Sequence, residues 1–285
     1  MDINILRGST KITSSQNTII KQTAALKQKK AREEEKLFLI EGLRFVEEAF
    51  KSNADIEKIF VTKEFIEGPN NAGFMENISM AFKSNKGDEI RHKPEVYVVA
   101  ENVFARMSDT ETPQGIMAVV RMRNENADKV FAEKGGIFLI LESIQDPGNM
   151  GTIIRTGDAA GVSGIFISKG CVDIYNPKVL RSTMGSIFHV PCIKCDDIIS
   201  TISALKTSGI KVIAAHLKGE KSYFEVNMKD GAAIIIGNEA NGISNSVAEA
   251  ADMLVKIPMP GKAESLNASV AAALMVYEAV RQQLS

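Results

Sequence analysis

Apolar residues in the second half of the chain come in short, dense runs with little polar alternation, separated by stretches with helical spacing. Runs of Ile, Val, Leu and Ala of this kind are typical of parallel strands that are buried on both faces of a sheet. The pattern predicts strands over 137–141, 164–168, 189–192, 212–215, 232–236 and 253–257. It predicts helices between them over 150–160, 178–186, 197–207, 244–251 and 269–283.

The first half of the chain shows a second, shorter alternation of strands and helices. Helices are predicted over 14–32 and 43–50, and strands over 38–40, 56–61, 95–99 and 115–121. Strand–helix alternation of this kind predicts an α/β domain. We therefore expect a small N-terminal α/β domain over 1–122, a polar linker over 123–134 and a larger α/β domain over 135–285.

Charge is balanced overall but is uneven along the chain. The formal net charge is −1, yet residues 1–32 hold one acid, Asp2, against seven basic residues, which are Arg7, Lys11, Lys21, Lys27, Lys29, Lys30 and Arg32. Such an arm can hold a phosphate backbone without making the whole protein basic. The alternative interpretation is a solvated N-terminal helix.

Composition points away from membranes, secretion and structural metals. The charged N-terminus is followed by no apolar signal segment, and no apolar run approaches the roughly 18 residues that span a bilayer. The 3 cysteines indicate a reducing, cytoplasmic compartment. Cys192 and Cys195 form a C-x-x-C with His189 nearby, but no second ligand pair follows, so we predict buried thiols and no metal.

Candidate chemistry lies where predicted strands end, because an open parallel sheet binds ligands at the carboxyl ends of its strands. The first segment, 146–155, holds Asn149 as a fitting helix N-cap, Gly151 for close packing, and Arg155 further along the helix. In the second segment, 237–242, two glycines bracket a carboxylate and two amides. In the third, 257–269, small polar residues lead into an alanine-rich helix. Each segment alone could be an ordinary capped helix or a glycine loop.

Together, the three segments resemble the signature motifs of the SpoU family of RNA 2′-O-ribose methyltransferases, within the SPOUT superfamily. The matching positions are Asn149-x-Gly151 with Arg155, then Ile236-Gly237-x-Glu239-x-x-Gly242, then Ile257-Pro258-Met259 with Ser265-Leu266-Asn267-Ala268-Ser269. This likeness covers about 136–285. The front of the chain, with Phe38-Leu39-Ile40-Glu41-Gly42 and the stretch 15–36, is similar to the L30e-like substrate-binding domain that many family members carry.

The resemblance implies a mostly parallel sheet flanked by helices and tied in a deep C-terminal trefoil knot, one of the exceptions to the rule against knots. It also implies a homodimer and bent S-adenosylmethionine held mainly by backbone groups. The implied catalytic residues are Asn149, Arg155, Glu239, Ser265 and Asn267. The implied cofactor-binding residues are Ala215, Gly237, Asn238, Gly242, Ile257, Met259, Leu266 and Ala271.

The chemistry of Arg155 favours a role other than general base. A guanidinium stays protonated in proteins and is therefore a poor base. It can stabilise a developing alkoxide or grip a phosphate bidentately. His216, which follows a predicted strand, is an alternative base, although a lone histidine there is more often a loop or core group.

The sequence therefore predicts an S-adenosylmethionine-dependent RNA ribose 2′-O-methyltransferase. A separate N-terminal domain favours a large structured RNA, so 23S ribosomal RNA is the first choice of substrate and transfer RNA the second. A catalytically silent RNA-binding protein of the same fold is a further alternative. A small-molecule enzyme is disfavoured because the glycine-rich dinucleotide fingerprint is absent.

Overall fold

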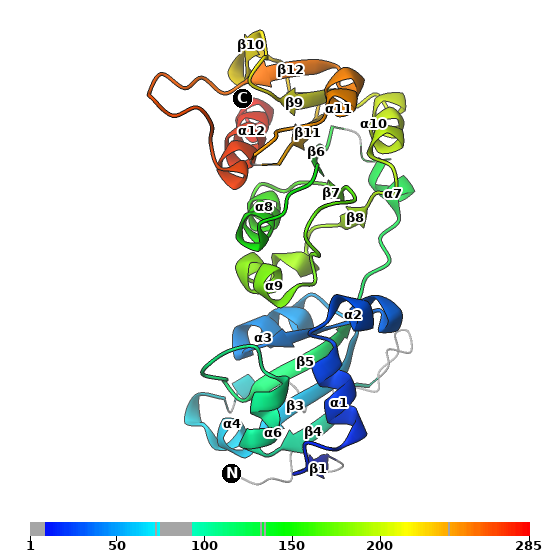
Figure 1. Ribbon diagram of the computed structural model, residues 1–285, viewed down its shortest axis with the longest axis vertical. Helices are drawn as coiled ribbons and strands as arrows, with labels where there is room; N and C mark the ends of the chain where they lie inside the picture. Colours follow the sequence, from blue (N-terminus) through cyan, green and yellow to red (C-terminus); the bar gives the residue numbers. More distant parts are fainter. Residues whose placement is uncertain (1–8, 72, 75–92, 132, 134, 239) are drawn as a thin grey trace. The chain divides into compact units, whose positions relative to one another are not determined.

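A computed structural model describes residues 9–71, 73–74, 93–131, 133, 135–238 and 240–285. It divides into two compact units, Met1–Arg123 and Asn124–Ser285 (Figure 1). Arg7 and Glu239, both expected to be functional, lie outside the described residues. Among those that are described, no helix is both long and apolar enough to cross a membrane.

The first unit is a mixed five-stranded sheet in the order β1-β4-β3-β5-β2. Its strands are β1 (Thr10–Ile12), β2 (Leu37–Glu41), β3 (Ile56–Thr62), β4 (Glu95–Val99) and β5 (Ile116–Arg121). β1, β3 and β4 run parallel, and β5 is antiparallel to both β2 and β3. The helices are α1 (Thr18–Ala25), α2 (Lys29–Glu35), α3 (Leu43–Lys51), α4 (Lys63–Glu67) and α6 (Glu101–Met107), with a 3-10 turn, η2 (Pro69–Asn71).

The single helix predicted over 14–32 is two helices, so that prediction was wrong. α1 begins after Asn17, whose side chain accepts the amide of Ile19, and it ends at Ala25. The guanidinium of Arg32 is buried and donates to the carbonyls of Leu26 and Lys27, at 2.9 and 2.8 Å. Carbonyls at a helix C-terminus have no partner within the helix, so this buried side chain satisfies the end of α1.

The second unit is a parallel seven-stranded sheet in the order β10-β12-β9-β11-β6-β7-β8, which confirms the predicted parallel sheet. Its strands are β6 (Ile137–Leu141), β7 (Gly164–Ile167), β8 (Cys192–Lys194), β9 (Val212–Ala215), β10 (Lys221–Ser222), β11 (Ala232–Ile236) and β12 (Met253–Lys256). Every residue of β6 and β11, at the centre, is buried, as the dense apolar runs require.

Helices cover both faces of this sheet (Figure 1). α8 (Pro147–Ala159), α9 (Pro177–Thr183) and α12 (Ala268–Gln283) lie on one face, and α7 (Ala127–Phe131), α10 (Ile198–Thr207) and α11 (Asn245–Ala250) lie on the other. Two 3-10 turns, η3 (Ser186–Phe188) and η4 (Tyr223–Glu225), complete the unit. The trefoil knot stays a prediction.

Two segments differ from the sequence predictions in this unit. The strand expected over 189–192 begins only at Cys192, because left-handed backbone at Met184 and Gly185 leads into η3 and leaves His189 outside the sheet. Part of the segment expected as a linker forms α7. Val130 is buried there, and the ring of Phe131 stacks on Phe166 with 5.2 Å between centroids. Apolar side chains therefore fix this segment to the second unit.

Candidate active site

Four adjacent parallel strands, β12, β9, β11 and β6, end at the same edge of the second sheet. β6 leads into the segment with Asn149, β11 into Gly237, and β12 into Ile257. The three motif segments thus start from one edge, although they are distant in sequence. This edge is where an open parallel sheet binds its ligands.

In the first segment, α8 begins at Pro147, three residues before the predicted start at residue 150. The side chain of Asp146 accepts the amide of Asn149 at 2.8 Å and is the N-cap, with Pro147 at the first helical position. Proline suits that position because the N–H that it lacks would have no partner in the first turn of a helix. Asn149 therefore lies in the first turn of α8, and its prediction as the cap was wrong.

Asn149 is instead paired with the third segment. The Nδ2 of Asn267 donates to Oδ1 of Asn149 at 2.8 Å. The Oδ1 of Asn267 accepts the amides of Ser269 at 2.9 Å and Val270 at 3.4 Å and is the N-cap of α12. Ser269, where the predicted helix 269–283 begins, is buried inside α12. One side chain thus starts α12 and holds it to α8.

Gly151 lets α8 and α9 approach closely. A Cβ at this position would lie 2.3 Å from Cβ of Ser182 and 2.8 Å from the carbonyl oxygen of Val179. Neither contact is sterically possible, so glycine is required for this packing. Arg155 follows one turn later on α8, and its side chain is exposed.

The second segment is a narrow loop closed by Asn238. Its backbone pairs with Gly242 in both directions, and its Oδ1 accepts the amides of Ala240 at 2.9 Å and Asn241 at 3.2 Å. Its Nδ2 donates to the carbonyl of Ser143 at 2.9 Å, which joins this loop to the first segment. A Cβ on Gly237 would lie 2.3 Å from the carbonyl carbon of Gly242, so only glycine permits the fold-back.

Sequence reasoning missed Glu142, which fastens the same two loops. Its carboxylate accepts the amide of Ser244 at 2.9 Å and the Oγ of Ser244 at 2.7 Å. Ser244, where the predicted helix 244–251 begins, is the N-cap of α11. The next residue, Ser143, has a left-handed backbone with φ 56° and bonds to Ser168 Oγ after β7. A polar pair, Glu142-Ser143, directly after an apolar strand was the available signal.

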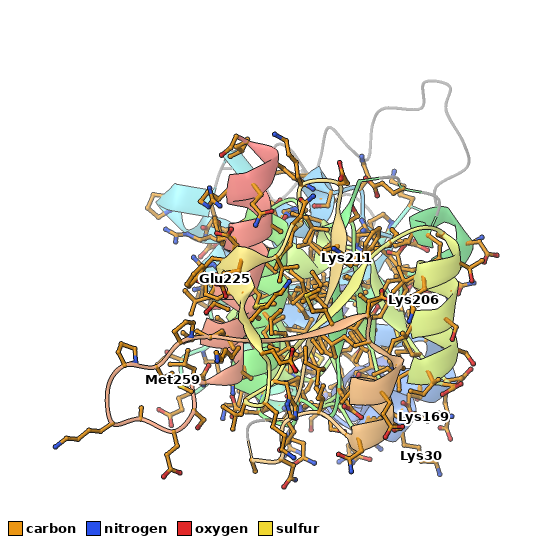
Figure 2. All side chains as sticks on the ribbon, turned by 90° about the horizontal axis from the view of Figure 1, so that it is seen from above. Lys30, Lys169, Lys206, Lys211, Glu225 and Met259 are labelled. Atoms are coloured by element: carbon orange, nitrogen blue, oxygen red, sulfur yellow. The ribbon has the colours of Figure 1, made fainter. Side chains whose placement is uncertain are left out.

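The third segment leaves the edge of the sheet. The loop between β12 and α12 stands away from the body of the unit, with Met259 upon it (Figures 1 and 2). Ser265 is exposed, and Leu266 is 37% exposed. Ile257 and Met259 are half-buried, as is Ala271 in the first turn of α12.

His216 follows Ala215 at the carboxyl end of β9 and serves its own loop. Its amide donates to the carbonyl of Val255 at 2.8 Å. Its Nδ1 accepts the amide of Lys218 at 3.1 Å. These contacts favour the loop role over that of a catalytic base. Ala215 is half-buried beside it, at the edge where the motif segments begin.

The basic residues near the N-terminus differ in their availability. Arg32 is buried as described, so its interpretation as an RNA-binding side chain is wrong. The ammonium of Lys27 bonds to the carbonyls of Arg106 and Ser108 within the same unit. Lys21, Lys29 and Lys30 are exposed, and the last two lie opposite Glu33 and Glu34 at 3.8 Å. Exposed pairs of this kind contribute little to stability and leave the lysines accessible.

The three cysteines are free thiols. Burial raises the pKa of the Cys171 and Cys195 thiols above its ordinary value, which disfavours the reactive thiolate. Across the residues that the structure describes, no three His, Cys, Asp or Glu side chains gather as metal ligands would.

Comparison with known families accounts for both units. The profile of the SpoU rRNA Methylase family matches residues 136–277, and that of the MRM3-like substrate binding domain matches residues 17–118. The chain belongs to the SpoU rRNA methylase family. The three motif segments lie within the matched range 136–277.

Relatives of known name are similar over nearly the whole chain. The 23S rRNA (guanosine(2553)-2′-O)-methyltransferase of Bacillus subtilis (strain 168) is 35% identical over 93% of this chain and 97% of its own length. The crystal structure of an AdoMet-bound rRNA methyltransferase from Sinorhizobium meliloti matches with a TM-score of 0.84 and 30% identity, covering 98% of this chain and 100% of that chain. The SpoU methyltransferase AviRb from Streptomyces viridochromogenes, with AdoMet, gives a TM-score of 0.82 and 26% identity over 95% and 99%.

Proposed function

We propose that this protein transfers a methyl group from S-adenosylmethionine to a ribose 2′-hydroxyl of 23S ribosomal RNA. The observation that carries the proposal is the joining of the motif segments at one sheet edge, with Asn149 and Asn267 hydrogen-bonded to each other. The Bacillus subtilis relative is named for this reaction and aligns over almost its full length. The base and the nucleotide position in that name are properties of the relative.

The residues at this edge suit a cofactor that is held by backbone groups. Gly237 and Ala215 have minimal side chains, which would let a ligand approach the backbone at the ends of β11 and β9. The loop 237–242 is held in shape by Asn238 before any ligand arrives. When bound there, S-adenosylmethionine would supply the methyl group from its sulfonium.

Arg155 is the residue that we assign to the reacting oxygen. A ribose hydroxyl is a poor acid and loses its proton as the new O–C bond forms, so negative charge develops on the oxygen. An exposed guanidinium on α8 can stabilise that charge or hold the neighbouring phosphate. Asn149 positions the start of α8, and Asn267 holds Asn149. Glu239 and Ser265 stay candidates for orienting the nucleotide.

The exposed face of α12 supports the homodimer that the family resemblance implies. Val270, Leu274 and Tyr277 recur at helical spacing and are 46%, 37% and 48% exposed. Large apolar side chains clustered on one exposed helix face mark interaction surfaces. A second copy of the chain packed there would place its own residues next to α8, because α12 and α8 are in contact. As an enzyme of ribosomal RNA, the protein would act in the cytoplasm.

Mapping of ribose methylation across total RNA from cells with and without the gene tests this function. We expect a single 2′-O-methyl mark in 23S ribosomal RNA to disappear with the gene and to return with the wild-type chain. The Arg155→Ala chain should not restore it. If the lost mark lies in transfer RNA, then transfer RNA is the substrate. An unchanged map would reject the methyltransferase function.

A further inference from the structure

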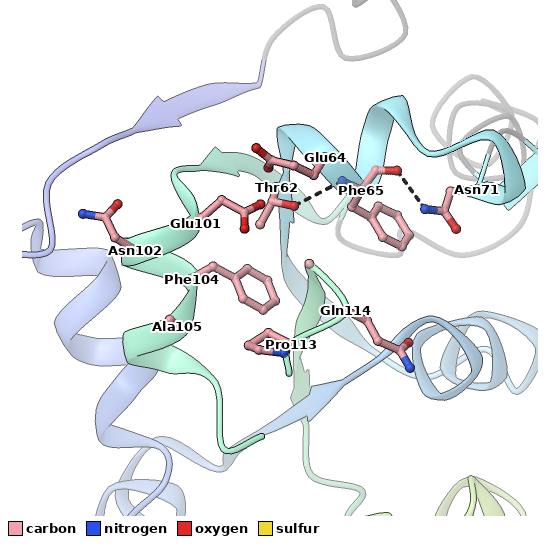
Figure 3. Close-up of a pocket in the computed structure, with 11 residues that line it drawn as sticks. Thr62, Glu64, Phe65, Asn71, Glu101, Asn102, Phe104, Ala105, Pro113 and Gln114 are labelled. Carbon is pink, nitrogen blue, oxygen red and sulfur yellow. Dashed lines mark hydrogen bonds between the residues drawn. The ribbon is translucent and has the colours of Figure 1, made fainter. Parts of the chain in front are cut away.

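The first unit contains a cavity of about 500 Å³ that the methyl-transfer chemistry does not use (Figure 3). It lies at the carboxyl ends of the parallel strands β3 and β4, where Thr62 ends β3 and Glu101 begins α6. It is lined by Thr62, Glu64, Phe65, Asn71, Glu101, Asn102, Phe104, Ala105, Pro113, Gln114 and Gly115. All of these residues fall within the match to a substrate binding domain, 17–118.

The floor of the cavity is apolar and its shape is fixed. Phe65 and Phe104 are 5% and 1% exposed, and both rings are directed toward the cavity in Figure 3. Gly115 has φ +79°, and a Cβ there would lie 2.5 Å from Oγ1 of Thr62, so a side chain cannot enter this wall. The Oγ1 of Thr62 accepts the amide of Phe65 at 3.2 Å and starts α4. The cavity is therefore built into the fold and is about the size of a small-ligand site.

The rim is a pair of carboxyl groups. The neighbouring carboxyl group of Glu101 lowers the pKa of Glu64, and that of Glu64 raises the pKa of Glu101. Together they present several acceptor oxygens at one point. No basic residue is among the lining residues that the structure describes, and carboxylates repel phosphate. The chemistry selects a flat, partly apolar group whose edge carries N–H donors.

We propose that this cavity receives an unpaired guanine base of the substrate RNA, with the guanine edge at Glu64 and Glu101. The proposal rests on the RNA substrate of the proposed function. Sequence-specific RNA recognition takes unstacked bases into pockets and reads their Watson–Crick edges. Guanine offers two neighbouring donors on that edge, the N1–H and the N2 amino group, which match the two oxygens of a carboxylate.

The other bases fit this rim less well. Uracil has a single N–H between two carbonyl oxygens, which would face the carboxylates. Adenine and cytosine each have one amino group next to a ring-nitrogen acceptor. Inosine keeps the N1–H of guanosine but lacks the 2-amino group, so it isolates one of the two donors.

The test is a titration of the full chain with nucleosides, monitored by NMR. Saturating S-adenosylmethionine is present throughout so that the cofactor site is filled. We expect guanosine to bind, and inosine, adenosine, cytidine and uridine to bind about fivefold or more weakly, as the loss of a bidentate base contact implies. Glu101→Gln should reduce the preference for guanosine over inosine. Equal binding of all five nucleosides would overturn the proposal.

A variant pair at Ala105 tests the location. Ala105 is an exposed residue of α6 on the cavity wall. Ala105→Trp fills the cavity and should abolish guanosine binding and raise the KM for RNA, with kcat at saturating RNA unchanged. Ala105→Ser leaves the space open and should behave as wild type. Guanosine binding by Ala105→Trp equal to that of wild type would reject this site.

These outcomes are separable from failure of the proposed function. Calorimetry with S-adenosylmethionine reports on the second unit, and the NMR spectrum of each Ala105 variant shows that its first unit is folded. If the chain binds guanosine at this cavity but does not bind S-adenosylmethionine, the base-pocket proposal stands and the methyltransferase proposal is rejected. The reverse result would keep the enzyme and reject the pocket.

Discussion

Asn267 and Asn149 are 118 residues apart in sequence, yet the amide of one donates to the amide oxygen of the other at 2.8 Å. The same Asn267 caps α12, so one side chain both starts a helix and fixes the first turn of α8. Arg155 lies on α8, beyond that turn. The geometry of the proposed catalytic helix therefore depends on the third motif.

Separating these two roles of Asn267 gives the first prediction. Asn267→Ser keeps a capping oxygen and loses the bond to Asn149, whereas Asn267→Ala loses both. We expect both variants to lower kcat/KM about tenfold through misplacement of α8. Only the alanine variant should lose a further ~1 kcal/mol of unfolding free energy, measured by urea denaturation. Wild-type kcat/KM in Asn267→Ser would show that the bond has no catalytic role.

Arg155→Ala should lower kcat about 100-fold or more, because it removes the group assigned to the developing charge. The affinity for S-adenosylmethionine, measured by calorimetry, should stay within a few fold. Thr152→Ala, one turn earlier on the exposed side of the same helix, is the matched control and should be active. Lost cofactor binding in Arg155→Ala would mean that the arginine belongs to the cofactor site.

Glu142→Ala should weaken S-adenosylmethionine binding about tenfold. The reason is that Ser244, just after the loop 237–242, loses its two hydrogen bonds to Glu142 and with them the link to β6. Glu142→Gln keeps one acceptor oxygen, so its affinity for S-adenosylmethionine should fall between those of wild type and Glu142→Ala. Asp197→Ala removes a comparable cap from α10 and should leave cofactor affinity unchanged. If Asp197→Ala weakens binding as much, the effect is general destabilisation.

Glu278 provides a pH dependence of stability. Its hydrogen bonds to Arg281, at 2.8 and 2.9 Å, lower the pKa of its carboxyl below the ordinary value. A group with a lowered folded-state pKa stabilises the protein above its unfolded pKa, about 4.3, and loses that contribution as pH falls. Glu278→Gln should cost about 1 kcal/mol of unfolding free energy at pH 7. The difference from wild type should shrink below pH of about 4, and a constant difference would contradict this assignment.

The apolar face of α12 predicts the oligomeric state. Leu274→Glu places a charge at the centre of that face and should convert a dimer to a monomer in sedimentation experiments. Ser203→Glu adds the same charge on α10, on the opposite face of the sheet, and should remain dimeric. A wild-type chain that sediments as a monomer would reject the homodimer.

Much of the second unit could be predicted because its strands are dense apolar runs. The predicted bounds of the strands 137–141, 212–215 and 232–236 agree with β6, β9 and β11. Errors lie where tertiary contacts decide an end. The start of α8 moved to Pro147 because Asp146 caps it, and the helix over 14–32 divided because Arg32 closes α1. Neither contact leaves a periodic signal.

By itself the sequence determined the parallel sheet and the three motif segments, since apolar periodicity and local residue types are written along the chain. Only the tertiary structure decided which side chains meet. It paired Asn267 with Asn149 and Glu142 with Ser244, and it buried Arg32 that charge alone had placed on the surface. Such pairings depend on the strand order β12-β9-β11-β6, which brings distant loops to one edge. Local pattern cannot encode that order, because long-range pairing is chosen by the packing of the whole core.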